Sequence, residues 1–434
     1  MNSGADELAR RLESALGPSA VKRDPQLLAS HAVDGISPIL FCLPNSPEQV
    51  ATALNICSEA EAALIAQGGG SAMRLGNRPR NLSVLLGMER LAGCIEHDAA
   101  NLTATVQSGI KLAALQQILA RQNQFFAVDP PKPDNATVGG TVAANLNGPR
   151  RTFYGGLRDM VIGMRVALIT GEHIKAGGKV VKNVAGYDMC KLFVGSLGTL
   201  GIITEVTLRL SPLPETAARL IARGTLPQTL GLADELSKSL LLPTSVSILN
   251  HVALPAGRTP SDSAVAVRFE GFDDSVARHL RDCMAMAERI RLRSEELRNN
   301  ANDPLWDEIR DFPVLNDRLV YRIVVPLSAL AKVMETIAEW SSDDFPLSMI
   351  GDAGTGTLWL SVEATDRGAT LFTRLTSVAQ EHGGHAIIFT APPGLKDDRD
   401  VWGPAPSTLD IMREIKRQFD PKGLLSPGRF VGGI

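Results

Sequence analysis

Glycines, small residues and lone Asn and Thr side chains gather in three clusters between residues 129 and 210 of this 434-residue chain. The clusters are residues 137–145, residues 154–156 and residues 195–204. Glycine allows positive φ angles and a close approach of the backbone to a bulky ligand, because it has no Cβ. One such cluster fits ordinary turn chemistry equally well, but three in succession predict a large ligand that lies along the main chain.

A further glycine run, Gly68 to Gly70 followed by Ser71, comes directly after the apolar segment 63–66, which is expected to be a strand. Consecutive glycines after a strand expose several backbone N–H groups in one concavity, which suits a pyrophosphate. A flexible turn explains the run equally well. If the loop holds a diphosphate, a side chain at Gly69 is expected to fill the diphosphate space, so that Gly69→Val folds but loses its ligand.

Two sequence motifs carry a family resemblance. Residues 182–188, K-N-V-A-G-Y-D, and residues 195–204, G-S-L-G-T-L-G-I-I-T, resemble the flavin-binding domain of the vanillyl-alcohol oxidase and p-cresol methylhydroxylase family, and within it the FAD-binding accessory subunits of bacterial glycolate oxidases. Residues 420–429 are similar to the tail D-P-x-G-x-L-N-P-G-K of that family, with Ser426 and Arg429 in place of Asn and Lys. The resemblance covers most of the first half of the chain and its last dozen residues.

The resemblance implies one FAD, with the glycine loop at residues 68–70 around its diphosphate. Some relatives anchor the flavin covalently through a His here or a Cys elsewhere; no His lies between His31 and His97, so we expect non-covalent FAD. Arg150, Arg151 and Lys182 could offset phosphate charge, although solvated surface positions explain them better. The residues that we assign to FAD are Gln67, Gly68, Gly69, Gly70, Ser71, Ala72, Gly76, Asn77, Asp129, Pro130, Thr137, Val138, Gly139, Gly140, Ala143, Asn145, Gly148, Tyr154, Gly155, Gly198, Thr199, Gly201, Ile202 and Ile203.

The histidines that carry out substrate chemistry in the family are missing from the corresponding stretches of this chain. Oxidation of a 2-hydroxy acid needs a hydride acceptor, a base for the hydroxyl proton and a positive group for the carboxylate. Catalytic members of the family carry an H-x-G-[DN]-G-N-L-H stretch and an E-H-G stretch, whereas residues 352–359 are D-A-G-T-G-T-L-W and residues 390–391 are Thr-Ala. We therefore expect no catalytic residue and no metal site, since His382 and His385 fit a helix face or a turn as well as a ligand pair.

Three functions remain open on this basis. The first is an electron-transferring FAD subunit of a glycolate oxidase complex, which oxidises glycolate to glyoxylate and contains a catalytic FAD chain and an iron–sulfur chain; the isolated chain is then inactive. The second is a self-sufficient FAD-dependent 2-hydroxy-acid dehydrogenase that uses Tyr187, Arg74 or His382 for proton handling. The third is a structural subunit, which the glycine clusters disfavour because a scaffold need not keep space for a cofactor.

Composition excludes several other classes. The 44 basic and 47 acidic residues leave a formal charge of -3, which does not favour nucleic acid or anionic lipid as a partner. The five cysteines are odd in number and lack a C-x-x-C spacing, which disfavours a disulfide framework, a zinc site or an iron–sulfur cluster in this chain. No run of eighteen apolar residues and no signal peptide is apparent, so we expect a cytoplasmic protein that reaches a membrane only peripherally, through its complex.

The length and the element pattern predict an α+β protein with two or three lobes. A change of character after Pro212 and Pro214 places a boundary near residue 215. The resemblance then implies a two-lobed FAD-binding domain over residues 1–215, a cap domain over residues 216–390 and a segment over residues 391–434 that returns to the FAD domain. Strands are expected at 264–272, 319–326, 357–362 and 386–389, and helices at 273–299 and 327–341, which suggests an antiparallel sheet covered by helices. Ser46, Pro47 and Gln49 predict a helix start with a capping box.

Overall fold

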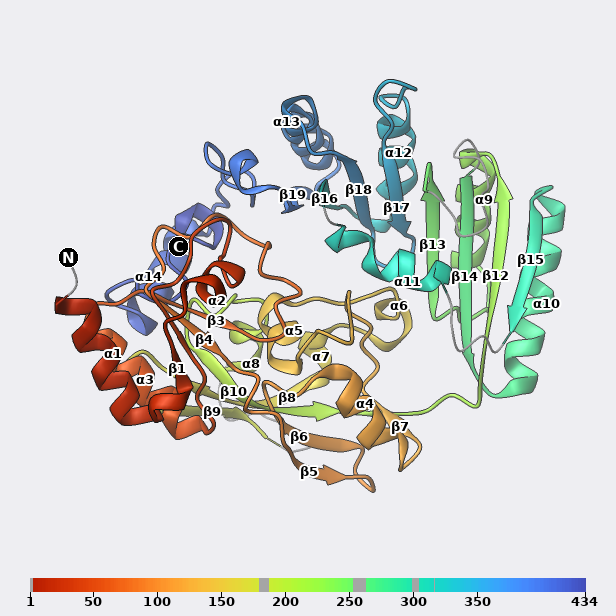
Figure 1. The fold of residues 1–434 in the computed structure, drawn as a ribbon. Coiled ribbons are helices and arrows are strands. Elements are labelled where there is room, and N and C mark those ends of the chain that lie inside the picture. The colour runs from red at the N-terminus through yellow and green to blue at the C-terminus, as the bar shows by residue number, and fades with distance from the viewer. Residues whose placement is uncertain (1–2, 179–186, 253–262, 299–303, 316) are drawn as a thin grey trace.

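The computed structural model describes residues 3–178, 187–252, 263–298, 304–315 and 317–434. Two lobes are visible in Figure 1: a first lobe formed by the N-terminal half of the chain, and a second lobe formed around one large sheet. The last segment of the chain, with α14 (Leu409–Phe419), lies beside the first lobe in the same view. The two ends of the sequence therefore contribute to one lobe.

The first lobe begins with a four-stranded sheet of order β1-β2-β4-β3. Strands β2, β4 and β3 run parallel, as expected when helices connect them, and β1 is antiparallel at one edge. Apolar side chains of α1 and α3 pack on one face of this sheet, and those of α2 pack on the other. The bounds are α1 (Ser3–Leu16), η1 (Pro18–Ala20), β1 (Val21–Lys22), α2 (Pro25–Ser30), β2 (Leu40–Cys42), α3 (Pro47–Glu59), β3 (Leu64–Gln67) and β4 (Val84–Gly87).

The predicted start of α3 is confirmed, with one difference. Gln49 N donates to Ser46 Oγ at 3.2 Å, which is the expected N-cap. The Gln49 side chain accepts from the backbone N of Asn45 at 2.9 Å rather than from that of Ser46. The reciprocal bond of the predicted capping box is therefore made one residue earlier in the chain.

The rest of the first lobe is built on an antiparallel five-stranded sheet of order β5-β6-β10-β8-β9. Helices α4, α5 and α8 contribute to the apolar core on this sheet. The glycine cluster at residues 138–144 is itself a helix, with Thr137 as its N-cap. The bounds are β5 (Cys94–Asp98), β6 (Thr103–Gln107), α4 (Leu112–Ala120), β7 (Gln124–Phe125), α5 (Val138–Ala144), α6 (Arg151–Tyr154), α7 (Leu157–Met160), β8 (Val161–Ala167), β9 (His173–Gly177), α8 (Cys190–Phe193), β10 (Ile202–Arg209) and β11 (Ser211–Pro212), which pairs with β7.

The second lobe is an eight-stranded antiparallel sheet of order β15-β12-β14-β13-β17-β18-β16-β19. Helices α9, α10, α12 and α13 bury one face, while α11 and η2 cover part of the other. The bounds are β12 (Thr216–Gly224), α9 (Leu226–Ser237), β13 (Ser245–Asn250), β14 (Ser263–Gly271), α10 (Asp273–Arg289), β15 (Arg293–Arg298), α11 (Pro304–Asp311), η2 (Phe312–Val314), β16 (Arg318–Val324), α12 (Leu327–Ala338), β17 (Ser348–Asp352), β18 (Thr357–Glu363), α13 (Asp366–Glu381) and β19 (His385–Thr390).

The predicted helix at 273–299 is wrong in its last part. Helix α10 ends at Arg289, and β15 then pairs antiparallel with β12 at the sheet edge. The sequence of β15, R-S-E-E-L-R, is rich in good helix formers, so local propensity favoured a longer helix. Pairing with the edge of the sheet outweighs that propensity.

The C-terminal segment returns to the first lobe, where Leu425 forms a parallel bridge with Leu64 of β3. Ile415 and Phe419 of α14 pack against the core of the five-stranded sheet. The division at residues 215 and 390 stays a prediction, although β12, the first strand of the large sheet, begins at Thr216. Within the described ranges no helix combines the length and the apolar character that a membrane crossing needs.

Candidate functional site

A cleft opens in the first lobe where three glycine segments meet. It lies between the end of β3, the start of α5 and the start of β10. The sequence-predicted residues that line it are Gly68, Gly69, Gly70, Ser71, Ala72, Thr137, Gly139, Gly140, Ala143, Gly198, Gly201, Ile202 and Ile203. Two of the three predicted clusters, at residues 137–145 and 195–204, thus meet the glycine run at residues 68–70, whereas the cluster at residues 154–156 does not line the cleft.

The glycine loop packs directly on the start of α5. A Cβ placed on Gly68 would lie 2.1 Å from Thr137 Oγ1, and one on Gly69 would lie 1.5 Å from the carbonyl oxygen of Asn135. The expectation that a side chain at Gly69 fills ligand space is therefore wrong, because it would strike backbone instead. These two glycines permit the close approach of two chain segments that shape the cleft.

Gly140 has a different environment. A Cβ on this residue would meet only Thr137 Oγ1 at 3.0 Å and the Cα of Gly68 at 3.9 Å, and Gly140 lines the cleft. Its N–H donates to Thr137 Oγ1 at 3.3 Å, which caps α5. Of Gly68, Gly69 and Gly140, only Gly140 could take an added methyl group, which would reduce the cleft, without a contact shorter than 3.0 Å.

Several predicted residues lie outside the cleft, where other contacts account for them. Gln67 bonds with His31 Nδ1 at 3.0 Å, and Asn77 donates to Asp400 at 3.0 Å. The Thr199 hydroxyl donates to the carbonyl of Ser196. Val138 belongs to the buried core, and Gly76 lies against the carbonyl oxygen of Arg429. Pro130 and Gly155 do not line the cleft either.

Tyr154 and Asp129, which the sequence assigned to FAD, belong to a buried network between the lobes. Glu270 of β14 binds Arg150 at 2.8 Å and Arg268 at 2.7 Å, and it accepts a bond from the Tyr154 hydroxyl at 3.2 Å. Burial opposes ionisation of Glu270, but Arg150 and Arg268 lower its pKa overall. The suggested role of Arg150 as a phosphate counter-charge is corrected by this pairing. Asp129 accepts from the Arg150 N–H at 3.2 Å, and burial raises its pKa to about 6.

Sequence reasoning missed some cleft residues. Ile65, Ala66, Met73, Met88, Ser108, Ala144, Leu197 and Arg429 also line the cleft. The Ser108 side chain is buried and its Oγ has no hydrogen-bond partner in the described part of the chain, so it is free to meet a polar ligand atom. Gly139 packs on Ser108, since a Cβ there would lie 2.4 Å from Ser108 Cβ. A lone serine after a strand gives no recognisable signal in one sequence.

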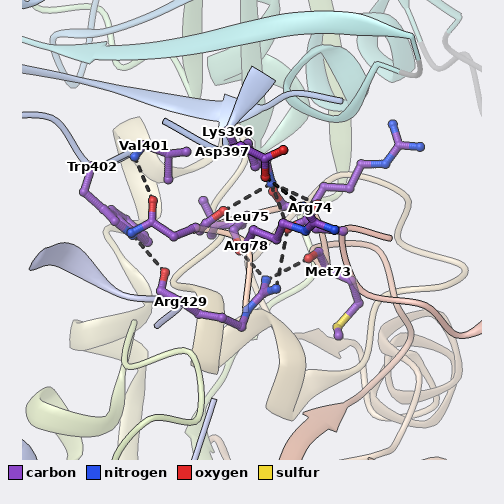
Figure 2. Close-up of polar contacts among 12 residues, drawn as sticks. Met73, Arg74, Leu75, Arg78, Lys396, Asp397, Val401, Trp402 and Arg429 are labelled. Carbon is purple, nitrogen blue, oxygen red and sulfur yellow. Dashed lines mark hydrogen bonds and ion pairs between the residues drawn. The ribbon is translucent and has the colours of Figure 1, made fainter. Parts of the chain in front are cut away.

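The loop that follows the glycine run is held by cations from the C-terminal segment (Figure 2). Arg429 Nη2 donates to the carbonyl oxygens of Met73 and Leu75. Lys396 Nζ donates to the carbonyl oxygens of Arg74 at 2.6 Å and Gly76 at 3.1 Å. The conformation of this cleft wall therefore depends on residues more than three hundred positions later in the chain.

A second cavity of about 250 Å³ lies between residues 145–151 of the first lobe and the open face of the large sheet. Asn145 and Gly148, which the sequence assigned to FAD, line this cavity instead of the cleft. Arg151 also lines it. Ala143 and Ala144 line the cleft and Asn145, the C-cap of α5, lines the second cavity, so the C-terminal end of α5 borders both spaces.

Asp352, the first residue of the stretch that resembles the H-x-G-[DN]-G-N-L-H motif, lines this second cavity. Its Oδ1 accepts from the Thr152 hydroxyl at 3.1 Å and from the Gly354 N–H at 2.9 Å. Burial raises the pKa of Asp352, and these bonds act against the rise. Within the described ranges, no group of three or more His, Cys, Asp and Glu side chains is arranged to hold a metal ion.

Comparison with known proteins identifies the family. A model of the FAD binding domain matches residues 38–177, and a model of the C-terminal domain of FAD linked oxidases matches residues 402–430. The glycolate oxidase subunit GlcE of Escherichia coli (strain K12) is 30% identical over 373 residues, which cover 84% of this chain and 92% of the relative. The chain belongs to the family of FAD-linked oxidases.

Other similar proteins are named for several different activities. The glycolate oxidase subunit GlcD of Bacillus subtilis (strain 168) is 27% identical, with 89% of this chain and 87% of the relative covered. The D-lactate dehydrogenase of Archaeoglobus fulgidus is also 27% identical, with 99% of each chain covered. A crystal structure of p-cresol methylhydroxylase has a TM-score of 0.76 at 16% identity and covers 99% of this chain and 97% of its own. This likeness confirms the predicted α+β fold of an FAD-binding domain with a cap domain.

The cleft of this FAD-linked oxidase fits its cofactor chemically. The glycine loop at residues 68–70 and the unpartnered Ser108 Oγ supply polar groups, while Met73 and Ile203 supply apolar walls. Residues 182–186 of the family motif, and Lys182 with them, lie outside the described residues. The first lobe is the FAD-binding domain, and the second lobe is the cap domain.

Proposed function

We propose that this chain is the FAD-binding, electron-transferring subunit of a glycolate oxidase complex that converts glycolate to glyoxylate. Its partners in this proposal are a catalytic FAD-linked chain and an iron–sulfur chain. Support comes from two relatives that are named as glycolate oxidase subunits, at 27% and 30% identity. The FAD is held without a covalent link.

The cofactor, when bound, supplies reversible uptake of electrons. The chain supplies the pocket. In this proposal the backbone N–H groups of Gly68 to Ser71 bind the diphosphate, and Ser108 donates or accepts one further hydrogen bond. Gly140 and Ile203 border the remaining cofactor surface. Arg429 and Lys396 act indirectly, because they fix the loop that forms one wall.

The observation that carries the relay function is the chemistry around Asp352. The catalytic family members have histidines where this chain has Asp352 and Trp359, and the Asp352 carboxylate already accepts bonds from Thr152 and Gly354. A missing positioned base costs about 10²–10⁴-fold in rate. An electron relay needs no such base, only a bound flavin and a partner close to it.

The test is a reconstitution. The catalytic chain is reduced with glycolate and mixed with the FAD-loaded chain under anaerobic conditions, and the flavin absorbance near ~450 nm is followed. We expect the flavin of this chain to bleach only when the partner is present. Elemental analysis of the purified chain should find no stoichiometric zinc, manganese or iron. Bleaching by glycolate without any partner would overturn the relay function.

One arrangement favours a second function, a self-sufficient 2-hydroxy-acid dehydrogenase. Arg322 and His385 both line the second cavity, so a cation and an imidazole border one space. Burial, and then Arg322, lower the pKa of His385, which keeps the imidazole neutral and able to accept a proton. Tyr187, Arg74 and His382, the residues suggested by the sequence, do not line this cavity, and Tyr187 is 95% exposed.

The two functions differ in one measurement. If the isolated chain is a dehydrogenase, glycolate or D-lactate bleaches its flavin in the absence of other proteins, and His385→Asn slows the bleaching by about 10²-fold or more. If it is a relay, neither acid bleaches the flavin in the wild-type chain. Rapid-mixing spectrophotometry on the FAD-loaded protein separates these results.

A further inference from the structure

The second cavity is floored by one face of the cap-domain sheet. In the β16–β18 register Arg322 lies opposite Trp359, and in the β16–β19 register Val324 lies opposite His385. Side chains alternate between the faces of a strand, so Arg322 and Val324 share a face while Ile323 between them points into the helix-covered core. The floor is therefore a set of neighbouring positions fixed by strand pairing.

Arg322 has no acidic partner in this environment. Its Nε is buried without a hydrogen-bond partner, and the described residues contribute no ion pair to its guanidinium. The rings of Trp359 and Phe389 lie 6.0 Å and 5.8 Å from its Cζ. Burial, and then Arg151, lower its pKa to about 10, so the group remains cationic at neutral pH. A desolvated cation without a counter-charge is costly, and an anionic ligand would remove that cost.

The other charges of the cavity do not neutralise Arg322. Arg310 also lines the cavity, but Asp311 at 3.0 Å and Asp307 at 2.8 Å balance its charge. This leaves Arg322 and Arg151 against the single carboxylate of Asp352. The hydrogen bonds of Asp352 are made with Thr152 and the following turn, not with Arg322. The cavity consequently has a net positive charge.

We infer that the second cavity binds a small carboxylate, with the guanidinium of Arg322 as its anchor. A guanidinium and a carboxylate match in a planar pair of hydrogen bonds, which a neutral alcohol cannot form. A phosphate can form the same pair, but it brings more negative charge next to the Asp352 carboxylate, which also lines the cavity. Thr357 and Asn147 also line the cavity and can hydrogen-bond a neighbouring hydroxyl group. A cavity of about 250 Å³ accommodates a molecule of a few heavy atoms. The inference rests on the proposed function for the identity of the ligand, a 2-hydroxy acid, and concerns binding without turnover.

The test uses the FAD-loaded full-length chain and calorimetric titration. Glycolate is compared with ethylene glycol, which lacks the carboxylate, and with inorganic phosphate, which offers a different anion. We expect saturable binding of glycolate, no binding of ethylene glycol and weaker binding of phosphate. Tryptophan fluorescence followed in parallel should respond to glycolate in the wild type and lose that response in Trp359→Phe.

Variants of Arg322 connect binding to the anchor. Arg322→Met should weaken glycolate binding about tenfold or more, because it removes a charge-assisted bond. Its melting temperature should stay equal or rise, since an unpaired buried charge is replaced by an apolar chain of similar length. The glycolate affinity of Arg322→Lys should lie between those of the wild type and Arg322→Met. The matched control is Arg318→Met in the same strand, where Arg318 donates to Ser361 Oγ and does not line the cavity.

The outcomes separate this inference from the function on which it rests. Absence of glycolate binding, binding that Arg322→Met leaves unchanged, or phosphate binding as tight as that of glycolate overturns the inference. The relay is judged by partner-dependent flavin bleaching, which needs no ligand in this cavity. If the isolated chain binds glycolate and glycolate also bleaches its flavin, the role of Arg322 as anchor stands and the relay function is excluded.

Discussion

Lys396 Nζ lies 3.0 Å from Asp34 Oδ2, and each side chain is only 1% exposed although the two residues are 362 positions apart. The remaining donors of the ammonium group bind the carbonyl oxygens of Arg74 and Gly76. The pair therefore joins the C-terminal segment to the wall of the FAD cleft. Removal of one partner of such a buried pair strongly lowers the free energy of unfolding, because the other charge then stays buried without a counter-charge.

Asp34→Asn should lower the free energy of unfolding by about 3–5 kcal/mol and weaken FAD retention. Urea unfolding followed by circular dichroism and a flavin-binding titration measure the two effects. The control is Asp397→Asn, next to Lys396, whose pair with Arg78 at 2.9 Å is 43% and 39% exposed. That variant should change stability by no more than about 1 kcal/mol. Equal losses in both variants would contradict the role of the buried pair.

Gly140→Ala should weaken FAD binding while the protein keeps or gains stability. The methyl group reaches into the cleft with only a contact of 3.0 Å to Thr137 Oγ1, and alanine favours a helix over glycine by about 1 kcal/mol. Fluorescence titration of the apoprotein with FAD, together with thermal melting, measures both quantities. We expect the dissociation constant to rise by about tenfold, since one contact of the cofactor is displaced.

The matched control for this substitution is Gly231→Ala in α9. Gly231 is also helical, and a Cβ there meets no atom within 4 Å. It should gain the same helix stability and leave FAD binding unchanged. An FAD affinity that is the same in both alanine variants would remove Gly140 from the cofactor site.

Precipitation with acid should release all flavin into the supernatant. The residues that line the cleft include Ser108, Met73 and Met88, but no His, Cys or Tyr of the described chain that could form a bond to the flavin. The spectrum of the supernatant, with the washed pellet as its control, gives the released fraction. Yellow colour that stays with the denatured pellet would disprove non-covalent attachment.

The sequence predicted those parts of the site that depend on the local backbone. Glycines at 68–70 and 139–140 and the cap at Ser46 act through their own main chain or through residues a few positions away, so one sequence contains the signal. The large antiparallel sheet of the cap domain was predicted for the same reason, from alternating segments such as β16. The number of strands was underestimated, and the segment that forms β15 was predicted as the end of a helix.

The residues that the sequence placed wrongly or missed act over long distances. Tyr154 stands beside two glycines, which suggested the cofactor, yet its hydroxyl binds Glu270 of the cap domain. Arg429 and Lys396 were not assigned at all, because only the fold brings them onto residues 73–76. Arg322 likewise looks like an ordinary strand residue until the pairing of β16 with β18 and β19 defines the face on which it lies.

Asp129→Asn should remove a pH dependence of stability. Burial raises the pKa of Asp129 from 3.8 to about 6, so between these values the folded protein binds a proton that the unfolded chain releases. Wild-type stability therefore falls by about 1.4 kcal/mol for each pH unit in that window as the pH rises. Asparagine keeps an acceptor for the Arg150 N–H without titrating. Urea unfolding at about pH 4, 5 and 7 measures the free energy of unfolding of both proteins. Relative to the wild type, that of the variant should increase as the pH rises, and a constant difference would contradict the burial effect.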